Sequence, residues 1–309
     1  MRTQSKVVII GAGHVGSHCA YSLAALGVCN EIVLLDIVPD LAKSHAADIA
    51  DGVTLLGSRP LVRHGDYDDC RDADIVVISA GVSRKPGQTR LDMLGASIRI
   101  MQDIAPKLTR SGFGGILVTI SNPADIVADY LRRNTGLPKS RVFSTGTSLD
   151  SARLRRILSE MYGVDRASVS AYSMGEHGDS QMIPFSAITV GGMPLNKFDP
   201  NPPYAHILER TRLSGMDIVI GKGSTEFGIG TVLAGVASAV LSDAKTILPL
   251  SVLLEGEYGI SGIHAGVPCL LGRNGIEKVL EIPLTEEEQR QLETSAGVIA
   301  KHCALAQEI

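Results

Sequence analysis

The chain is 309 residues long, with 44% hydrophobic and 20% charged residues, so it is long enough for two packed lobes and too apolar for a disordered protein. Its formal net charge is -4 at pH 7, and acidic and basic residues are interspersed, so we expect no basic face for nucleic acid. No apolar run has the length needed to cross a bilayer, which argues against a membrane protein.

Short apolar runs alternate with longer amphipathic stretches through the first half of the chain. The run Val7-Val8-Ile9-Ile10 is continuously apolar, as expected of a parallel strand covered on both faces. A turn and a helix are predicted within residues 11–27. Further strands are predicted over residues 31–37, 74–80, 115–120 and 141–143, and helices over residues 42–49 and 91–108. This alternation predicts an α/β fold with a doubly wound parallel sheet and right-handed crossovers.

The pattern of strands and helices changes in the second half of the chain, which predicts a mixed α+β catalytic domain. Its last helix has a capping-box pattern, Thr285 with Glu288 three residues later, and is expected to run to about His302. Residues 196–204 are rich in Pro and Asn and predict a loop. Helices are predicted over residues 151–161, 207–216 and 230–242, and strands of a mixed or antiparallel sheet over residues 168–174, 187–191, 247–254 and 266–271. The change of pattern near residues 144–149 predicts domains 1–145 and 146–309.

A glycine-rich hexapeptide, Gly11-Ala12-Gly13-His14-Val15-Gly16, lies between the first strand and the first helix. Gly11 permits a tight turn, Gly13 lets the backbone approach a pyrophosphate, and Gly16 lets the helix pack on the strand. Asp36 follows 20 residues after Gly16, where a carboxylate accepts hydrogen bonds from the adenosine ribose and repels a 2′-phosphate. The alternative is an ordinary strand, turn and helix with a strand-end aspartate. The order of these features favours a Rossmann-type domain that binds NAD, with Val15 lining the cofactor and His14 on its solvent side.

Four further segments carry a resemblance to a known family. They are AGVSRKPGQTRLDML at residues 80–94, SNP at 121–123, GTSLDSAR at 146–153 and GEHGDS at 175–180. In this order and spacing they resemble the lactate/malate dehydrogenase family over essentially the whole chain. The resemblance implies an NAD-dependent L-2-hydroxyacid dehydrogenase that transfers a hydride reversibly between NAD and a small 2-keto or 2-hydroxy acid.

The resemblance implies a catalytic role for four residues whose chemistry suits this reaction. His177 matches the acid/base of the family, and histidine titrates near working pH. Asp150 matches the carboxylate that orients the imidazole and favours its charged form. Arg153, three residues later on the same helix face, matches the guanidinium that binds the substrate carboxylate, and Arg90 matches the one that polarises the carbonyl. Each residue alone fits an ordinary structural role as well; their combination with the glycine loop favours catalysis.

The remaining motif positions match the walls of the same site. Residues 83–89 match a lid that closes over the substrate and excludes water. Asn122 matches a residue that contacts the nicotinamide ribose and the substrate. Ala80 and Gly81 begin the first of the family segments and are expected to contact the cofactor.

Two positions give opposite indications about the substrate. Arginine at the position of Arg84 accompanies malate dehydrogenases, because it can pair the second carboxylate of oxaloacetate, whereas pyruvate would leave it unpaired. Thr225 borders the substrate side chain and, with residues 89–94, 177–180 and 224–225, resembles the lactate branch. A long arginine side chain can also place its head in water. We therefore expect pyruvate and L-lactate as substrates, with oxaloacetate and L-malate, or a broader set of 2-hydroxy acids, as the alternative.

The resemblance also bears on assembly and regulation. It implies a homotetramer. Bacterial lactate dehydrogenases that bind a sugar bisphosphate between subunits use an arginine and a histidine; Arg155 matches the arginine, but Ser170 stands at the histidine position. Half of that anion site is therefore missing, which argues against activation by the bisphosphate.

Two other classes of NAD-dependent protein do not fit the residues of this sequence. A redox-sensing NAD-binding regulator would carry the glycine loop without the His177, Asp150 and Arg153 set, and an NAD-dependent glycosidase would need a metal-binding Cys/His set. No His/Cys/Asp/Glu cluster has metal-ligand spacing, so we expect no metal. Five scattered cysteines without a Cys-x-x-Cys pair, and an N-terminus without a signal-peptide pattern, predict buried reduced thiols and a cytoplasmic enzyme of carboxylic acid metabolism.

Overall fold

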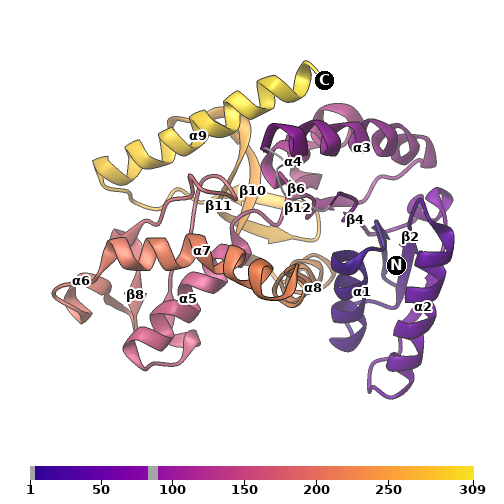
Figure 1. The fold of residues 1–309 in the computed structure, drawn as a ribbon, viewed down its shortest axis with the longest axis horizontal. Helices are drawn as coiled ribbons and strands as arrows, with labels where there is room; N and C mark the ends of the chain where they lie inside the picture. Colours follow the sequence, from indigo (N-terminus) through magenta and orange to yellow (C-terminus); the bar gives the residue numbers. More distant parts are fainter. Residues whose placement is uncertain (1–3, 83–89) are drawn as a thin grey trace.

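A single large sheet organises the protein (Figure 1). The structure is a computed structural model that describes residues 4–82 and 90–309, with side chains from residue 93 onward in the second segment. Within these residues nine strands form the sheet, in the order β12-β11-β10-β6-β5-β4-β1-β2-β3. The strands are β1 (Lys6–Ile10), β2 (Glu31–Leu35), β3 (Leu61–His64), β4 (Ile75–Ile78), β5 (Ile116–Thr119), β6 (Val142–Ser144), β10 (Thr246–Glu255), β11 (Ser261–Gly272) and β12 (Gly275–Val279).

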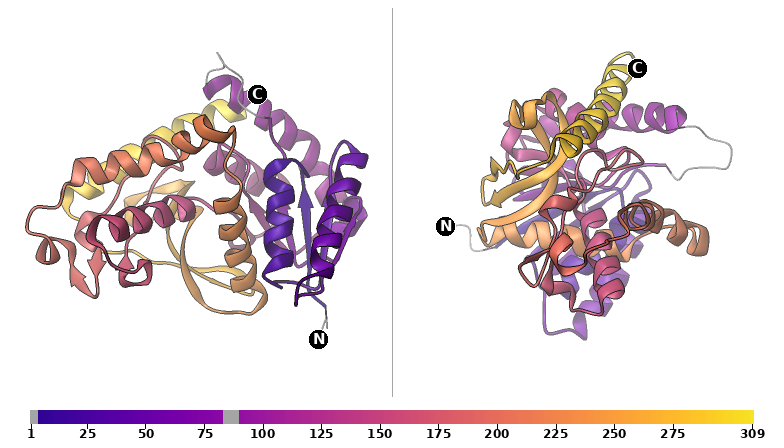
Figure 2. Two further views of the ribbon diagram at one scale, coloured as in Figure 1. Left: turned by 60° about the horizontal axis from the view of Figure 1, so that its bottom comes forward. Right: turned by 90° about the vertical axis from the view of Figure 1, so that its left-hand side faces the viewer.

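The six strands of the first half are parallel and doubly wound, which confirms the predicted fold class. Along β1, Val7 and Ile9 pack into the core under α1 and α2, and Val8 and Ile10 pack under α3 and α4. Both faces are covered, so the strand is apolar at every position. Figure 2 shows α1 and α2 side by side against the parallel strands. The helices are α1 (His14–Ala25), α2 (Pro39–Thr54), α3 (Arg90–Ser111), α4 (Ala124–Thr135), α5 (Ser148–Tyr162), α6 (Leu195–Phe198), α7 (Tyr204–Lys222), α8 (Phe227–Leu241) and α9 (Glu286–Gln307).

The second half continues the same sheet instead of building a separate one. β10 pairs antiparallel with β6 through Ser251 and Ser144, and β11 and β12 follow as an antiparallel extension. α9 then crosses back to pack on α4 and α3, so that the C-terminal helix returns to the first half of the chain (Figures 1 and 2). Its predicted capping box is present: the side chains of Thr285 and Glu288 each accept a hydrogen bond from the other's backbone N–H.

Two predicted strands are much shorter than expected. The strand over residues 168–174 is reduced to β7 (Val169–Ser170), and the strand over residues 187–191 to β8 (Thr189–Val190); with β9 (Met193–Pro194) they form a small antiparallel sheet. Beyond β7 the chain leaves this sheet, and Gly175 instead bridges to Gly266 on β11. The apolar residues that suggested a longer strand are buried without being paired as one: Ala171 packs in the core cluster of α5, and Met174 packs in the main core.

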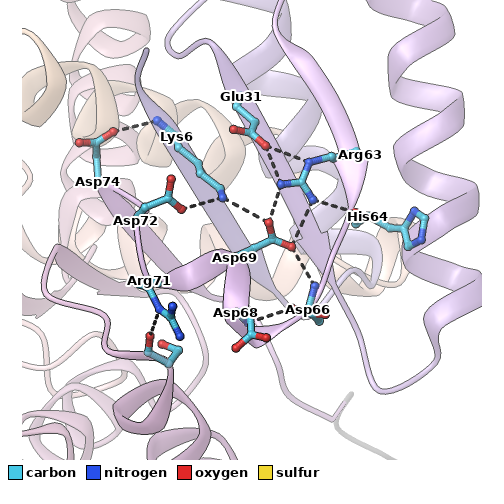
Figure 3. A network of polar contacts seen from close by, with 11 residues as sticks. Lys6, Glu31, Arg63, His64, Asp66, Asp68, Asp69, Arg71, Asp72 and Asp74 are labelled. Atoms are coloured by element: carbon cyan, nitrogen blue, oxygen red, sulfur yellow. Dashed lines mark hydrogen bonds and ion pairs between the residues drawn. The ribbon is translucent and has the colours of Figure 1, made fainter. Parts of the chain in front are cut away.

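A charged network joins the first residues of β1 and β2 to Arg63 on β3 (Figure 3). Asp69 accepts hydrogen bonds from Arg63 and Lys6, and Arg63 also pairs with Glu31. Arg63 is the main cause that lowers the pKa of Asp69 to about 2. The network therefore ties these three neighbouring strands together through side chains as well as through their backbone hydrogen bonds.

None of the helices in the described ranges combines the length and apolar character needed to span a bilayer.

Candidate active site

The glycine loop lies at the carboxyl edge of the parallel strands, where the strand order reverses between β1 and β4. Ligands of doubly wound folds bind at this switch point. Gly11 has φ +101°, and a Cβ there would lie 2.5 Å from the backbone N of Ala80. A Cβ at Gly16 would lie 1.9 Å from the Gly11 carbonyl, whereas one at Gly13 would meet nothing within 4 Å. Gly11 and Gly16 thus allow close packing, and the backbone at Gly13 faces open space.

This arrangement fits a dinucleotide. α1 begins after Gly13 without a side-chain cap, so its first N–H groups are available to an anion. Asp36 follows β2 directly, and its carboxylate accepts hydrogen bonds from the backbone N–H groups of Ala12 and Val38 at 2.7 and 3.0 Å. The loop and the acidic residue are therefore fixed to each other. Val15 is half-buried and His14 is exposed at the start of α1.

The segments that follow β4 and β5 complete this edge. Ala80 is half-buried and Gly81 exposed after β4, and the Ser121 hydroxyl donates to the Ala80 carbonyl at 2.6 Å. Asn122 is exposed after β5, and its carbonyl accepts a hydrogen bond from Ser97 on α3 at 2.7 Å. All the predicted cofactor residues thus lie at one edge of the sheet, on the loops after β1, β2, β4 and β5 or in the first turn of α1.

The half-buried His177 and the buried Asp150 form a hydrogen-bonded pair. His177 Nδ1 donates to Asp150 Oδ2 at 2.6 Å, and the side chain of Asp150 is 3% exposed against 25% for His177. Asp150 raises the pKa of His177 to about 9, against the opposing effects of burial and of Arg153. Burial by itself would raise the pKa of Asp150, but His177 and Arg153 together hold it below its usual range. At neutral pH the pair is therefore an imidazolium and a carboxylate.

Arg153 lies one turn after Asp150 on α5, as its spacing predicts. Its Nη1 donates to Asp150 Oδ1 at 3.1 Å, so one carboxylate holds both cations. Gly215 on α7 makes room for the guanidinium, because a Cβ there would lie 3.1 Å from Nη1. A cavity of about 1340 Å³ between α5, α7 and the start of α8 is lined by Arg153 and Thr225, among others. Thr225, which the sequence predicts to border the substrate, is half-buried and lines this cavity.

Two predicted residues lie outside what the structure describes. Arg84 and the lid segment 83–89 fall between the described ranges, and the side chain of Arg90, the first residue of α3, is likewise not described. Their roles remain predictions.

The loop of His177 is held by residues that the sequence did not single out. The backbone N–H of His177 donates to Asp125 Oδ2 on α4 at 2.9 Å, and the N–H of Glu176 donates to the Ser295 hydroxyl on α9 at 2.8 Å. Gly175 and Gly266 exchange two backbone hydrogen bonds of 2.8 Å. Asp125 lies two residues after Pro123, and this closeness to a predicted site segment was the one available indication in the sequence.

The five cysteines are all free and buried, as predicted. Burial raises the pKa of each of them to about 12, so they are inert thiols. Among the residues with described positions, no group of three or more His, Cys, Asp or Glu side chains is arranged to hold a metal ion.

Comparison with known proteins places this geometry in a family. Residues 5–144 match the NAD binding domain of lactate/malate dehydrogenase, and residues 147–308 match its alpha/beta C-terminal domain. The chain is 43% identical to an L-lactate dehydrogenase of Fusobacterium nucleatum over 96% of this chain and 95% of the relative, and 44% identical to L-lactate dehydrogenase 3 of Bacillus cereus over 96% of each.

Solved structures agree with these relatives. A lactate dehydrogenase from a deep-sea metagenome of the Medee basin superposes with a TM-score of 0.94 at 36% identity, covering 98% of this chain and 99% of that one. The ligand-bound minor L-lactate dehydrogenase of Enterococcus mundtii gives a TM-score of 0.95 at 35% identity over 98% of both chains. Because the two domain matches together span almost all of its residues, the chain belongs to the lactate/malate dehydrogenase family, the NAD-dependent 2-hydroxyacid dehydrogenases.

Proposed function

We propose that this protein is an L-lactate dehydrogenase that interconverts pyruvate and L-lactate. The observation that carries the proposal is the buried Asp150 carboxylate that holds both His177 and Arg153. This one group presents a proton donor and a carboxylate-binding cation side by side, which is what reduction of a 2-keto acid requires. The names of the similar bacterial proteins support pyruvate as the keto acid.

In the proposed mechanism each residue acts on a defined atom of the substrate. Arg153 binds the carboxylate through its two-pronged guanidinium, which orients C2. The His177 imidazolium gives its Nε2 proton to the carbonyl oxygen as C2 is reduced, and takes the proton back from the hydroxyl in the reverse direction. Asp150 stabilises the imidazolium and fixes its tautomer. Arg90 polarises the carbonyl, and the lid at residues 83–89 excludes water.

NAD supplies or accepts the hydride at C2 when it is bound at the switch point. We propose that Gly11, Gly13, Val15 and Gly16 hold its pyrophosphate side, with His14 towards solvent, and that Asp36 binds the adenosine ribose. Ala80 and Gly81 contact it after β4, and Asn122 contacts the nicotinamide ribose and substrate. The open backbone at Gly13 and the uncapped start of α1 support this assignment.

The second candidate substrate is oxaloacetate, which Arg84 favours on its chemistry. The test is kcat/KM for NADH-dependent reduction of pyruvate and of oxaloacetate, in the native chain and in Arg84→Gln. We expect the native chain to prefer pyruvate, and Arg84→Gln to raise that preference roughly tenfold or more, since it removes the partner of a second carboxylate. Preference for oxaloacetate in the native chain would make this a malate dehydrogenase. If the ratio of kcat/KM for pyruvate to kcat/KM for oxaloacetate is unchanged in Arg84→Gln, Arg84 does not determine which substrate is preferred.

We also propose that the protein is a cytoplasmic homotetramer. Large apolar side chains are exposed together on α7, among them Leu213 at 49%, Met216 at 48% and Ile220 at 78%. Exposed apolar side chains that gather on helices support association with further copies. Light scattering on the purified protein is expected to give the mass of four chains, and a monomer mass would contradict the proposal.

A further inference from the structure

Asp125 is a buried carboxylate beneath the His177 loop. It lies in the first turn of α4, two residues after Pro123 of the segment that follows β5, and only 1% of its surface is exposed. Its Oδ2 accepts the backbone N–H of His177 at 2.9 Å, whereas its Oδ1 has no hydrogen-bond partner. Asp125 therefore joins the proposed substrate-side segment of the first domain to the loop of the proposed acid/base.

Asp129, one turn later on the same helix, is a structural carboxylate with which Asp125 can be compared. Asp129 is also buried, but it pairs with Arg132, Arg133 and His264. Burial acts to raise the pKa of Asp129, yet His264 and Arg133 hold it at about 2. The two aspartates share a helix face and a degree of burial, and differ in whether a cation compensates their charge.

Asp125 lacks such compensation except from His177. Within the described residues it takes part in no ion pair with Lys or Arg, and burial raises its pKa to about 6. The nearby groups are Glu176, which acts in the same direction, and His177 and Ser251 on β10, which act against it. Cys303 on α9 lies close enough for Asp125 to raise the pKa of its thiol. A buried carboxylate without a fixed cation is costly, so it is poorly explained by stability alone.

We propose that Asp125 is a positioning residue of the reaction, which fixes the backbone of His177 and places a second negative charge near its imidazolium. This inference rests on the proposed function of His177. Asp125 acts in the same direction as Asp150 on the imidazole, so both carboxylates favour its protonated form. Because Asp125 is attached to the Asn122 segment, it also keeps the acid/base in register with the cofactor edge of the sheet.

The test replaces Asp125 with asparagine and follows the titration of His177. Asparagine keeps an oxygen that accepts the His177 N–H but removes the charge. The first readout is the rate at which diethyl pyrocarbonate modifies the His177 peptide, measured by mass spectrometry against pH in the full chain without cofactor. The second is the alkaline limb of kcat/KM for pyruvate reduction. In Asp125→Asn we expect both to move to lower pH by roughly one pH unit.

Asp129→Asn is the matched control, since it removes a buried carboxylate of the same helix that does not contact His177. It is expected to lower the Tm by several degrees, about as a lost buried ion pair does, with the His177 titration unchanged. Asp125→Glu should restore the native titration. If Asp125→Asn does not fold, Asp125→Ser decides by the same modification readout, since its smaller side chain also removes the charge.

The proposal is overturned if the pH of His177 modification is the same in Asp125→Asn as in the native chain, or if Asp129→Asn shifts it equally. The modification readout needs no substrate. Failure to reduce pyruvate would therefore count against the proposed function, and an unshifted titration would count against the role of Asp125.

Discussion

Replacing His177 with asparagine is expected to lower kcat for pyruvate reduction by about a thousandfold while the affinity for NADH stays within a few-fold of the native value. Asparagine is close to histidine in size and can still donate to Asp150, but it has no proton to give at neutral pH. The glycine loop and Asp36 lie on other segments, so the cofactor edge is left intact. Steady-state rates measure kcat, and a fluorescence titration with NADH measures the affinity for the cofactor.

The pH dependence of the native enzyme checks the same assignment. The pKa of His177 is raised to about 9, chiefly by Asp150, so the imidazolium needed for reduction is present below that pH and is lost as pH rises through it. kcat/KM for pyruvate should fall about tenfold per pH unit above about 9, whereas lactate oxidation, which needs the neutral imidazole, should rise through the same range. Substantial turnover in His177→Asn would remove His177 from the mechanism.

The first half of the fold was predictable because its strands are buried on both faces. Continuous apolar runs such as Val7 to Ile10 and Ile75 to Ile78 can form little else between turns and amphipathic helices. The edge strand β3, Leu61–His64, was missed because it has only four residues with an irregular burial pattern, and its pairing with β2 makes it a strand. Helix α4 was also missed; its apolar residues are divided between two core clusters, and its buried residues include Asp125 and Asp129, so that its buried side includes charged positions.

The candidate site was predictable where residues are close in sequence or belong to a motif. Asp150 and Arg153 are three residues apart on one helix, so local geometry alone brings them together. Asp150 and His177 are 27 positions apart in the sequence, and Asp125 and His177 are 52 positions apart, so only the tertiary fold brings each pair together. Motif resemblance supplied the first of these pairs. Apart from its closeness to the Asn122 and Pro123 segment, nothing local marks Asp125, because an aspartate in the first turn of a helix is an ordinary way to complement its dipole.

Arg153→Lys is expected to lower kcat/KM for pyruvate by roughly a hundredfold to ten-thousandfold, with NADH affinity unchanged. The side chain of Arg153 is 12% exposed and donates to Asp150, with Gly215 leaving space for its planar head. A lysine ammonium is a point charge that cannot meet a substrate carboxylate with two parallel hydrogen bonds, and its shorter reach weakens the contact with Asp150 as well. Both losses fall on the bound substrate, so KM should rise and kcat should fall together.

Arg156→Lys is the matched control for this prediction. Arg156 lies on the same helix, is 44% exposed and pairs with Glu160, so the same exchange at that position should change kcat/KM by no more than about twofold. Equal activities in the two variants would mean that Arg153 does not bind the substrate carboxylate. We expect the loss to be confined to Arg153→Lys and to recur with every 2-keto acid that the enzyme accepts. All these substrates share the carboxylate and differ beyond C2, so this result would identify the carboxylate as the group that Arg153 binds.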